Sequence, residues 1–253
     1  RDVLHGNFGK SYIYGKPAMD LIFERMPATL ELVAVAACLV LCIAIPLGVY
    51  AGAYPKRASS KLIMSGSILG ISLPSFWVGM MMIYIFAVVL RLLPASGRGN
   101  TVMVGNVALS IFAPGGIRYV ILPAITLALT NVATMLRLTR SGILENMRQD
   151  YIKFARAKGV PAKSILFGHA LKNALIPVVT IFGMDLGNMI AFTTITETIF
   201  AWPGMGKLLI DAINKSDRPI IVAYLMAAAC MFVVLNFIVD ILYTLIDPRI
   251  ELR

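Results

Sequence analysis

Long uncharged apolar segments dominate the chain. A helix needs roughly 20 apolar residues to cross a hydrocarbon core of about 30 Å, and five segments qualify. They are about Leu30–Tyr54, Leu62–Leu90, Tyr119–Leu138, Ala174–Phe200 and Pro219–Ile246. The second is long enough to tilt or to kink at Pro74. The pattern predicts an all-α polytopic membrane protein with five transmembrane helices.

The stretch Gly99–Ile117 is also uncharged, but glycine, proline and asparagine interrupt it repeatedly. We therefore expect an external loop or a re-entrant piece there rather than a spanning helix. Three glycine pairs inside the spans have the small-xxx-small spacing that lets helix backbones approach each other in lipid. They are Gly48 with Gly52, Gly66 with Gly70, and Gly183 with Gly187. They favour a packed helix bundle.

Composition supports the membrane class. Hydrophobic residues make up 58% of the chain and charged residues 14%, whereas soluble domains have about 45–50% and about 25%. The net charge of +10 would favour nucleic-acid binding in a soluble protein, but here its distribution indicates a membrane, so no nucleic-acid partner is expected. Cys38, Cys42 and Cys230 lie in apolar runs without a metal-binding or redox spacing.

Basic residues in short loops predict the orientation. Lys56, Arg57 and Lys61 lie between the first two spans, and the segment 137–172 carries a net charge of +6. We expect both loops in the cytoplasm, which places residues 1–28 outside and the C-terminus inside. The loop with Arg91, Arg98 and Arg118 then lies outside, against the rule.

The alternation of loops between the two sides of the membrane leads to an expectation about the full-length protein. An external N-terminus without a signal-peptide pattern is unusual. We therefore expect a further transmembrane helix upstream of this chain, which would give six in all.

The segment 145–177 predicts a compact cytoplasmic knob. Glu145 to Lys158 contains neither proline nor glycine and suits a helix that Gly159 ends in a left-handed conformation. Pro161 suits the first turn of a second short helix running toward His169. Two alternatives remain at this point: a basic helix pair lying on anionic lipid, or a knob that docks onto a protein.

The order of residues in this segment is similar to a known pattern. One stretch reads D-Y-I-x-x-A-R-A-K-G, and a second reads H-A-x-x-N-A-L-x-P. The residues are Asp150, Tyr151, Ile152, Ala155, Arg156, Ala157, Lys158 and Gly159, then His169, Ala170, Asn173, Ala174, Leu175 and Pro177. This resembles the coupling loop of permeases in the dipeptide/oligopeptide/nickel family of ATP-binding-cassette (ABC) importers. The generic Glu-Ala-Ala of such loops is replaced by Lys153, Phe154 and Ala155, as in the peptide-type branch.

Further stretches resemble landmarks of that family over nearly the whole chain. They are Glu24–Ala36, Ile45–Gly52, Ile71–Met80, Glu197–Leu209 and Asp247–Ile250. The resemblance implies the type I importer permease fold, with residues 1–253 as one permease domain, an external segment 1–28 and a coupling loop at about 139–173. It also implies a multi-pass protein of the bacterial inner membrane.

The resemblance further implies the partners and the mechanism. They are a second, related but different permease, two cytoplasmic ATPases that bind ATP and Mg²⁺, an external solute-binding protein, and membrane lipid. The permease itself binds no cofactor and performs no bond chemistry. The solute is a peptide or a similar small compound, and dipeptides, oligopeptides, nickel chelates and glutathione stay open. The coupling residues carried over are Asp150, Tyr151, Ala155, Arg156, Ala157, Lys158, Gly159, His169 and Asn173.

Ionisable residues inside the spans offer a second set of candidates. Asp185 and Glu197 lie in the fourth span and Asp240 in the fifth. They either form hydrogen bonds and interfacial contacts, or they line a polar translocation path, for which Asp185 is best placed. The turn at Trp202 either braces an external gate or anchors the chain in the lipid interface.

Enzyme classes find little support. Gly9-Lys10-Ser11 ends like a phosphate-binding loop, but Leu4 occupies the position of its first glycine. Two histidines, and no HExxH or GxSxG motif, give neither a metal site nor a hydrolase site. A secondary transporter would need more helices and more acidic residues at mid-membrane than Asp185 supplies.

Overall fold

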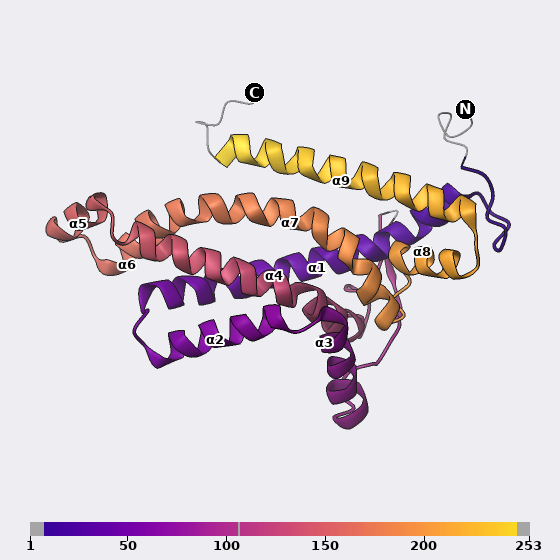
Figure 1. Ribbon diagram of the computed structural model, residues 1–253, viewed down its shortest axis with the longest axis horizontal. Helices are drawn as coiled ribbons and strands as arrows, with labels where there is room; N and C mark the ends of the chain where they lie inside the picture. The colour runs from indigo at the N-terminus through magenta and orange to yellow at the C-terminus, as the bar shows by residue number, and fades with distance from the viewer. Residues whose placement is uncertain (1–7, 106, 247–253) are drawn as a thin grey trace. The chain divides into compact units, whose positions relative to one another are not determined.

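The computed structural model describes residues 8–105 and 107–246, and Figure 1 follows the order of its elements along the chain. The helices are α1 (Ala18–Ala53), α2 (Ala58–Ser72), α3 (Ser75–Met82), η2 (Ile83–Val89), α4 (Ile117–Asn146), α5 (Asp150–Ala157), α6 (Ala162–Ser164), η3 (Ile165–Ala170), α7 (Leu171–Ile199), α8 (Met205–Asn214) and α9 (Arg218–Ile246). The segments η2 and η3 are π-helical. The motif Asp247–Ile250 and the side chain of Asp240 lie outside the described residues.

The all-α prediction is confirmed. Four helices of the described residues are long and apolar enough to cross a membrane, and a fifth span is present if α2 is counted together with α3 and η2. The expected kink at Pro74 is instead a break, because Leu73 and Pro74 are both extended between α2 and α3. Helix α1 begins at Ala18, earlier than the expected Leu30. Its 36 residues make a helix of about 54 Å, longer than an apolar core needs.

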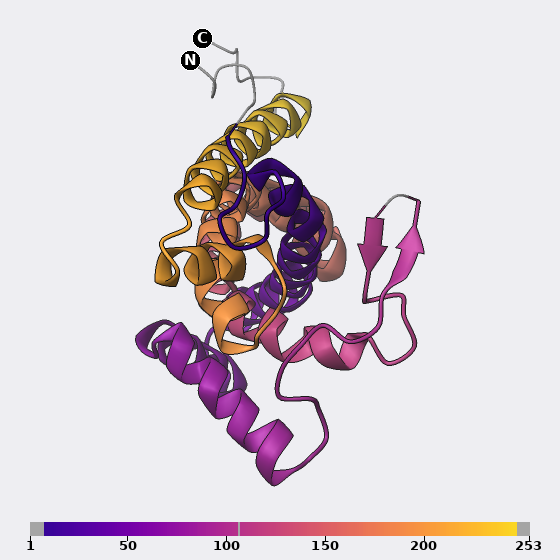
Figure 2. The ribbon, with the colours of Figure 1, turned by 90° about the vertical axis from the view of Figure 1, so that its right-hand side faces the viewer.

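The uncharged stretch Gly99–Ile117 contains a small hairpin that the sequence analysis missed. Strands β1 (Val102–Val104) and β2 (Val107–Leu109) pair antiparallel, with Met103 opposite Ala108. Figure 2 shows the two strands side by side. The rest of the stretch before α4 is irregular, as its glycines and prolines suggest.

The chain forms two compact units. The first comprises residues 1–36, 74–127 and 186–235, and the second comprises residues 37–73, 128–185 and 236–253. Helices α1, α4, α7 and α9 each contribute residues to both units. The single permease domain stays a prediction.

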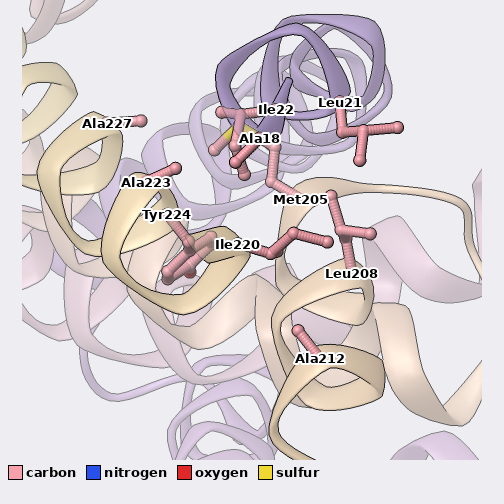
Figure 3. Close-up of a cluster of buried hydrophobic side chains, with 10 residues drawn as sticks. All are labelled: Ala18, Leu21, Ile22, Met205, Leu208, Ala212, Ile220, Ala223, Tyr224 and Ala227. Carbon is pink, nitrogen blue, oxygen red and sulfur yellow. The ribbon is translucent and has the colours of Figure 1, made fainter. Parts of the chain in front are cut away.

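In the first unit, α8 is buried against α1 and α9. This ten-residue helix buries Met205, Leu208 and Ala212, an apolar stripe at helical spacing. Figure 3 shows these side chains close to the first turns of α1 and α9. The cluster comprises Ala18, Leu21, Ile22, Met205, Leu208, Ala212, Ile220, Ala223, Tyr224 and Ala227. No helix was predicted between the last two spans, so α8 is a correction.

Two of the three glycine pairs act as predicted. A Cβ on Gly52 would lie 2.7 Å from Cβ of Ile143, and a Cβ on Gly48 would lie 2.6 Å from Cβ of Thr139, so both glycines let α1 approach α4. Gly183 and Gly187 likewise lie directly against side chains of α9. In the third pair, a Cβ on Gly70 would lie 3.5 Å from Cβ of Ala133, whereas Gly66 has nothing within 4 Å, so only one of its two glycines lies at a helix contact.

Candidate functional site

The candidate coupling loop leaves the second unit between α4 and α7. Helix α4 continues to Asn146, and three residues of tight turn precede α5, which starts at Asp150. The prediction of a helix beginning at Glu145 was therefore wrong: Glu145 is the penultimate residue of α4. No proline follows Pro123 in this stretch, and Gly142 interrupts a helix only weakly, so nothing ends α4 before Met147.

The turn after α5 has the geometry that the sequence predicted. Gly159 has φ +77°, a region that glycine enters without steric cost. The N–H of Val160 donates to the carbonyl of Ala155 at 3.1 Å, and the N–H of Gly159 donates to that of Arg156 at 3.0 Å. These two bonds form a Schellman motif, which satisfies the carbonyls at the end of α5.

The second short helix is not separate. Pro161 is the N-cap residue of α6, one position before the first turn in which it was predicted, and α6 continues through η3 into α7. Residues 162–199 therefore form one helical segment of 38 residues. The knob consists of α5 and the Gly159 turn attached to the start of this long helix, and Figure 1 shows α5 and α6 together at one end of α4 and α7.

A small apolar core holds α5 in place. Ile152 of α5 is fully buried together with Ile165 and with residues of α1, α4 and α7; the cluster comprises Val49, Ile143, Ile152, Ile165, Ala170 and Ala174. Gly142 allows the close approach of α4 and α7, because a Cβ there would lie 3.0 Å from Cβ of Ala174. The knob is thereby packed against three long helices.

A chain of hydrogen bonds joins both ends of the knob. The Tyr151 hydroxyl donates to Oδ1 of Asn146 at 2.8 Å and accepts from Nδ2 of Asn173 at 3.0 Å. Tyr151 and Asn173 were candidates from the sequence, whereas Asn146 was missed because it precedes the motif. The hydroxyl thus connects the end of α4 to the start of α7.

The outer surface of the knob is apolar and basic. Phe154 and Phe167 are 61% and 59% exposed, and Nζ of Lys158 lies 4.5 Å from the Phe154 ring centroid. Arg156, Ala157 and His169 are also exposed, and Ala155 is half-buried. Lys153 donates a hydrogen bond to Asp150 at 2.8 Å, which lowers the pKa of that carboxyl. Exposed aromatic side chains with a basic rim are typical of a surface that meets a partner.

The two acidic candidates in α7 have different surroundings. Asp185 is half-buried, whereas Glu197 is fully buried. Oε1 of Glu197 accepts from the Thr29 hydroxyl at 2.6 Å, and Oε2 accepts from the N–H of Lys207 at 2.9 Å. Glu197 therefore ties α1 and α7 to the first turn of α8. Whether either residue lines a path stays a prediction.

The turn between α7 and α8 is buried. The Trp202 indole is completely inaccessible, and its Nε1–H donates to the carbonyl of Ala28 at 2.9 Å. An anchor in the lipid interface is therefore excluded for Trp202. Gly204 is required beside it, because a Cβ there would collide with the Glu197 carboxylate.

A buried ion pair that the sequence analysis missed anchors the hairpin loop. Arg98 donates to Oε2 of Glu31 at 2.5 and 2.9 Å. Oε1 of Glu31 accepts from the N–H groups of Ser110 and Ile111 at 2.6 and 2.7 Å. One of the three arginines that contradicted the charge rule is thus neutralised by an acidic residue of α1.

Comparison with known proteins assigns this architecture to a family. Residues 44–252 match the family described as "Binding-protein-dependent transport system inner membrane component". The oligopeptide transport system permease protein AppB of Bacillus subtilis is 41% identical over 99% of this chain and 78% of its own length. The probable D,D-dipeptide transport system permease protein DdpB of Escherichia coli is 37% identical over 98% of this chain and 77% of its own length.

Solved structures support the fold. An inward-facing methionine ABC transporter, MetNI, superimposes with a TM-score of 0.69 at 16% identity, over 90% of this chain and 97% of the other. An amino acid ABC transporter superimposes with a TM-score of 0.57 at 14% identity, over 91% and 94%. The fold is the type I importer permease fold. The chain therefore belongs to the family of inner membrane components of binding-protein-dependent transport systems, as a multi-pass permease subunit and not an enzyme.

Proposed function

We propose that this permease subunit takes up peptides as part of an ABC importer. The names of relatives at 41% and 37% identity, an oligopeptide and a D,D-dipeptide permease, support the substrate class. The observation that carries the importer mechanism is the knob: α5 and the Gly159 turn, packed on three long helices, present two exposed phenylalanines and a basic rim.

The knob couples the chain to a cytoplasmic ATPase. Phe154 and Phe167 enter an apolar groove of that partner, and Arg156 and Lys158 meet its acidic rim. Since Ile152 is buried among residues of α1, α4 and α7, a displacement of α5 moves these helices instead of bending the loop. A packed core transmits displacement because it cannot deform continuously. The function of Asp150, Ala155, Ala157, Lys158, Gly159 and His169 is to form this stiff contact.

The partners and the orientation follow from this mechanism. Two ATPases bind ATP and Mg²⁺, a related second permease completes the pathway, and a solute-binding protein delivers peptide from outside. The knob and the C-terminus lie in the cytoplasm, and residues 8–17 and the β-hairpin lie outside. The Glu31–Arg98 ion pair supports this orientation because it removes one unbalanced charge from the external loop. The chain itself binds neither nucleotide nor metal.

Asp185 is the better candidate for the peptide path. Glu197 is fully buried near the end of α7, where both of its oxygens accept hydrogen bonds in the α8 turn. Asp185 is half-buried in the middle of α7. Acidic residues within membrane spans commonly mark a polar pathway.

Uptake by the reconstituted importer tests the proposal. The full-length subunit, co-purified with its neighbouring permease and ATPases, is placed in liposomes with loaded binding protein outside and ATP inside. We expect labelled di- or oligopeptide to accumulate only with ATP. Accumulation driven by an ion gradient without ATP would contradict the importer mechanism, whereas ATP-driven uptake of a non-peptide solute alone would contradict the substrate class.

A further inference from the structure

A second site lies in the first unit, away from the coupling loop. A cavity of about 510 Å³ opens between Arg91–Pro94, which follow the end of η2, and the first turn of α4. This volume is in the range of about 300–1,000 Å³ typical of small-ligand sites. Arg91, Asn100, Arg118 and Tyr119 supply hydrogen-bond donors to its wall, and Leu92 supplies an apolar edge.

Two arginines of the external loop that have no acidic partner in the described part of the chain, Arg91 and Arg118, line the cavity. Arg98 of the same loop is paired with Glu31. Among the described residues, neither Arg91 nor Arg118 forms an ion pair. Arg118 also lies in the first turn of α4, where the helix dipole disfavours a cation. An anion in the cavity would balance both positive charges and offset the unfavourable position of Arg118.

The wall is built from constrained backbone. Arg91 has φ +53°, which is rare for a residue other than glycine and is found preferentially at functional sites. The N–H groups of Leu92 and Leu93 fix this turn by donating to the carbonyl of Phe86 at 2.9 and 3.2 Å. On the opposite side, Gly99 lies against Tyr119, since a Cβ on Gly99 would be 2.6 Å from the ring.

The surroundings indicate what kind of anion fits. Leu90 and Leu92, which flank Arg91 in the chain, and Ile117, which precedes Arg118, are 49%, 61% and 57% exposed. The cavity also lies where one apolar segment ends at Leu90 and the next begins at Ile117. In the orientation proposed above, the end of one span and the start of the next lie at the level of the lipid headgroups. An amphipathic ligand satisfies both the arginines and the apolar rim, whereas an acidic protein surface satisfies only the arginines.

We propose that this cavity binds the phosphate headgroup of an anionic phospholipid. Both guanidinium groups and the Asn100 amide donate to the phosphate oxygens, a geometry for which arginine is well suited. The acyl chains follow the exposed apolar side chains at the ends of the two spans. The site therefore accounts for arginines on a face where the charge rule disfavours them.

Lipid binding to the purified permease complex tests this site. Native mass spectrometry measures retention of phosphatidylglycerol and of phosphatidylcholine with the same acyl chains. We expect phosphatidylglycerol to bind preferentially, and R118Q and R91N each to weaken it by about tenfold, the loss typical of one charge-assisted hydrogen bond. R218Q is the matched control, because Arg218 is an exposed arginine in the first turn of α9 that does not line the cavity.

Further arms separate the possible occupants. Only variants that keep the wild-type melting temperature are compared. R91K/R118K keeps the charges but loses the planar donors, and it should bind phosphatidylglycerol at a level between wild type and the single variants R91N and R118Q. Inorganic phosphate and glycerol phosphate should not displace the lipid at equal concentration; displacement would identify a free-anion site and overturn the proposal. Equal retention by R118Q and wild type would also overturn it. A third result would also overturn the proposal: arginine variants that retain lipid like wild type but bind the solute-binding protein more weakly. That result would assign the arginines to a protein contact.

Discussion

The Glu31–Arg98 ion pair gives the sharpest stability prediction. The side chains are 2% and 11% exposed, so each charge depends on its partner. E31Q preserves the shape of the side chain, but its single oxygen faces either Arg98 or the N–H groups of Ser110 and Ile111. If it faces the N–H groups, an NH₂ group points at the guanidinium. Breaking a buried pair in this way costs about 3–5 kcal/mol.

Hydrogen exchange of the loop measures this cost. If the Arg98–Ile111 segment opens locally, a loss of about 3–5 kcal/mol increases the exchange of the Ser110 and Ile111 amides by about 150-fold to 4,000-fold. E24Q on the same helix is the matched control, because Glu24 and Lys16 form an exposed pair at 3.7 Å that contributes at most about 1 kcal/mol. Exchange in E31Q within about threefold of wild type, or an equal change in E24Q, would refute the reasoning.

Two further substitutions test local contacts. Y151F removes a hydroxyl that makes two hydrogen bonds and should lower the hydrogen-exchange protection of the α5 amides by about 1–2 kcal/mol. Y12F is the control, because the Tyr12 side chain is 74% exposed, and it should leave protection unchanged. Equal protection in Y151F and wild type would contradict the link between α4 and α7 through the Tyr151 hydroxyl. G204A forces a Cβ against the Glu197 carboxylate and should lower the melting temperature in detergent by several degrees. G66A is the control, because a Cβ there meets nothing within 4 Å, and it should be neutral or slightly stabilising. A wild-type melting temperature for G204A would contradict the prediction, because it would show that the turn accommodates a Cβ.

Local patterns predicted the features that depend on local physics. Hydropathy identified the five apolar segments because lipid requires about 20 apolar residues per span. The position of Gly159 after a charged amphipathic segment predicted its left-handed turn, since few other residues adopt that conformation. The glycine spacing on α1 predicted close packing, but it gave no indication that α4 is the partner.

Features that depend on distant partners could not be predicted. Two stretches recognised separately, Glu24–Ala36 and Glu197–Leu209, meet through the Thr29–Glu197 and Ala28–Trp202 hydrogen bonds. Nothing in either stretch specifies the other. The same holds for Glu31, whose partner Arg98 is 67 positions away.

Other errors came from signals that were available but underweighted. Met205, Leu208 and Ala212 form a helical stripe that predicts α8, but a helix of ten residues is too short to be detected by a search for membrane spans. The continuous helix from α6 into α7 follows from the absence of proline between Pro161 and Pro177, and Gly168 interrupts a helix only weakly. These corrections leave the candidate coupling residues together on one knob.

The central claim is that this knob couples ATP hydrolysis to transport, and Gly159 tests it most directly. A Cβ at this position meets nothing within 4 Å, so G159V is expected to act through backbone strain at φ +77°. G159N tolerates that conformation. ATPase activity and peptide uptake are measured together in the reconstituted complex with loaded binding protein. We predict that G159N keeps both activities, and that G159V assembles and hydrolyses ATP but loses uptake. Normal uptake by G159V, or a wild-type subunit that never associates with an ATPase, would contradict the account.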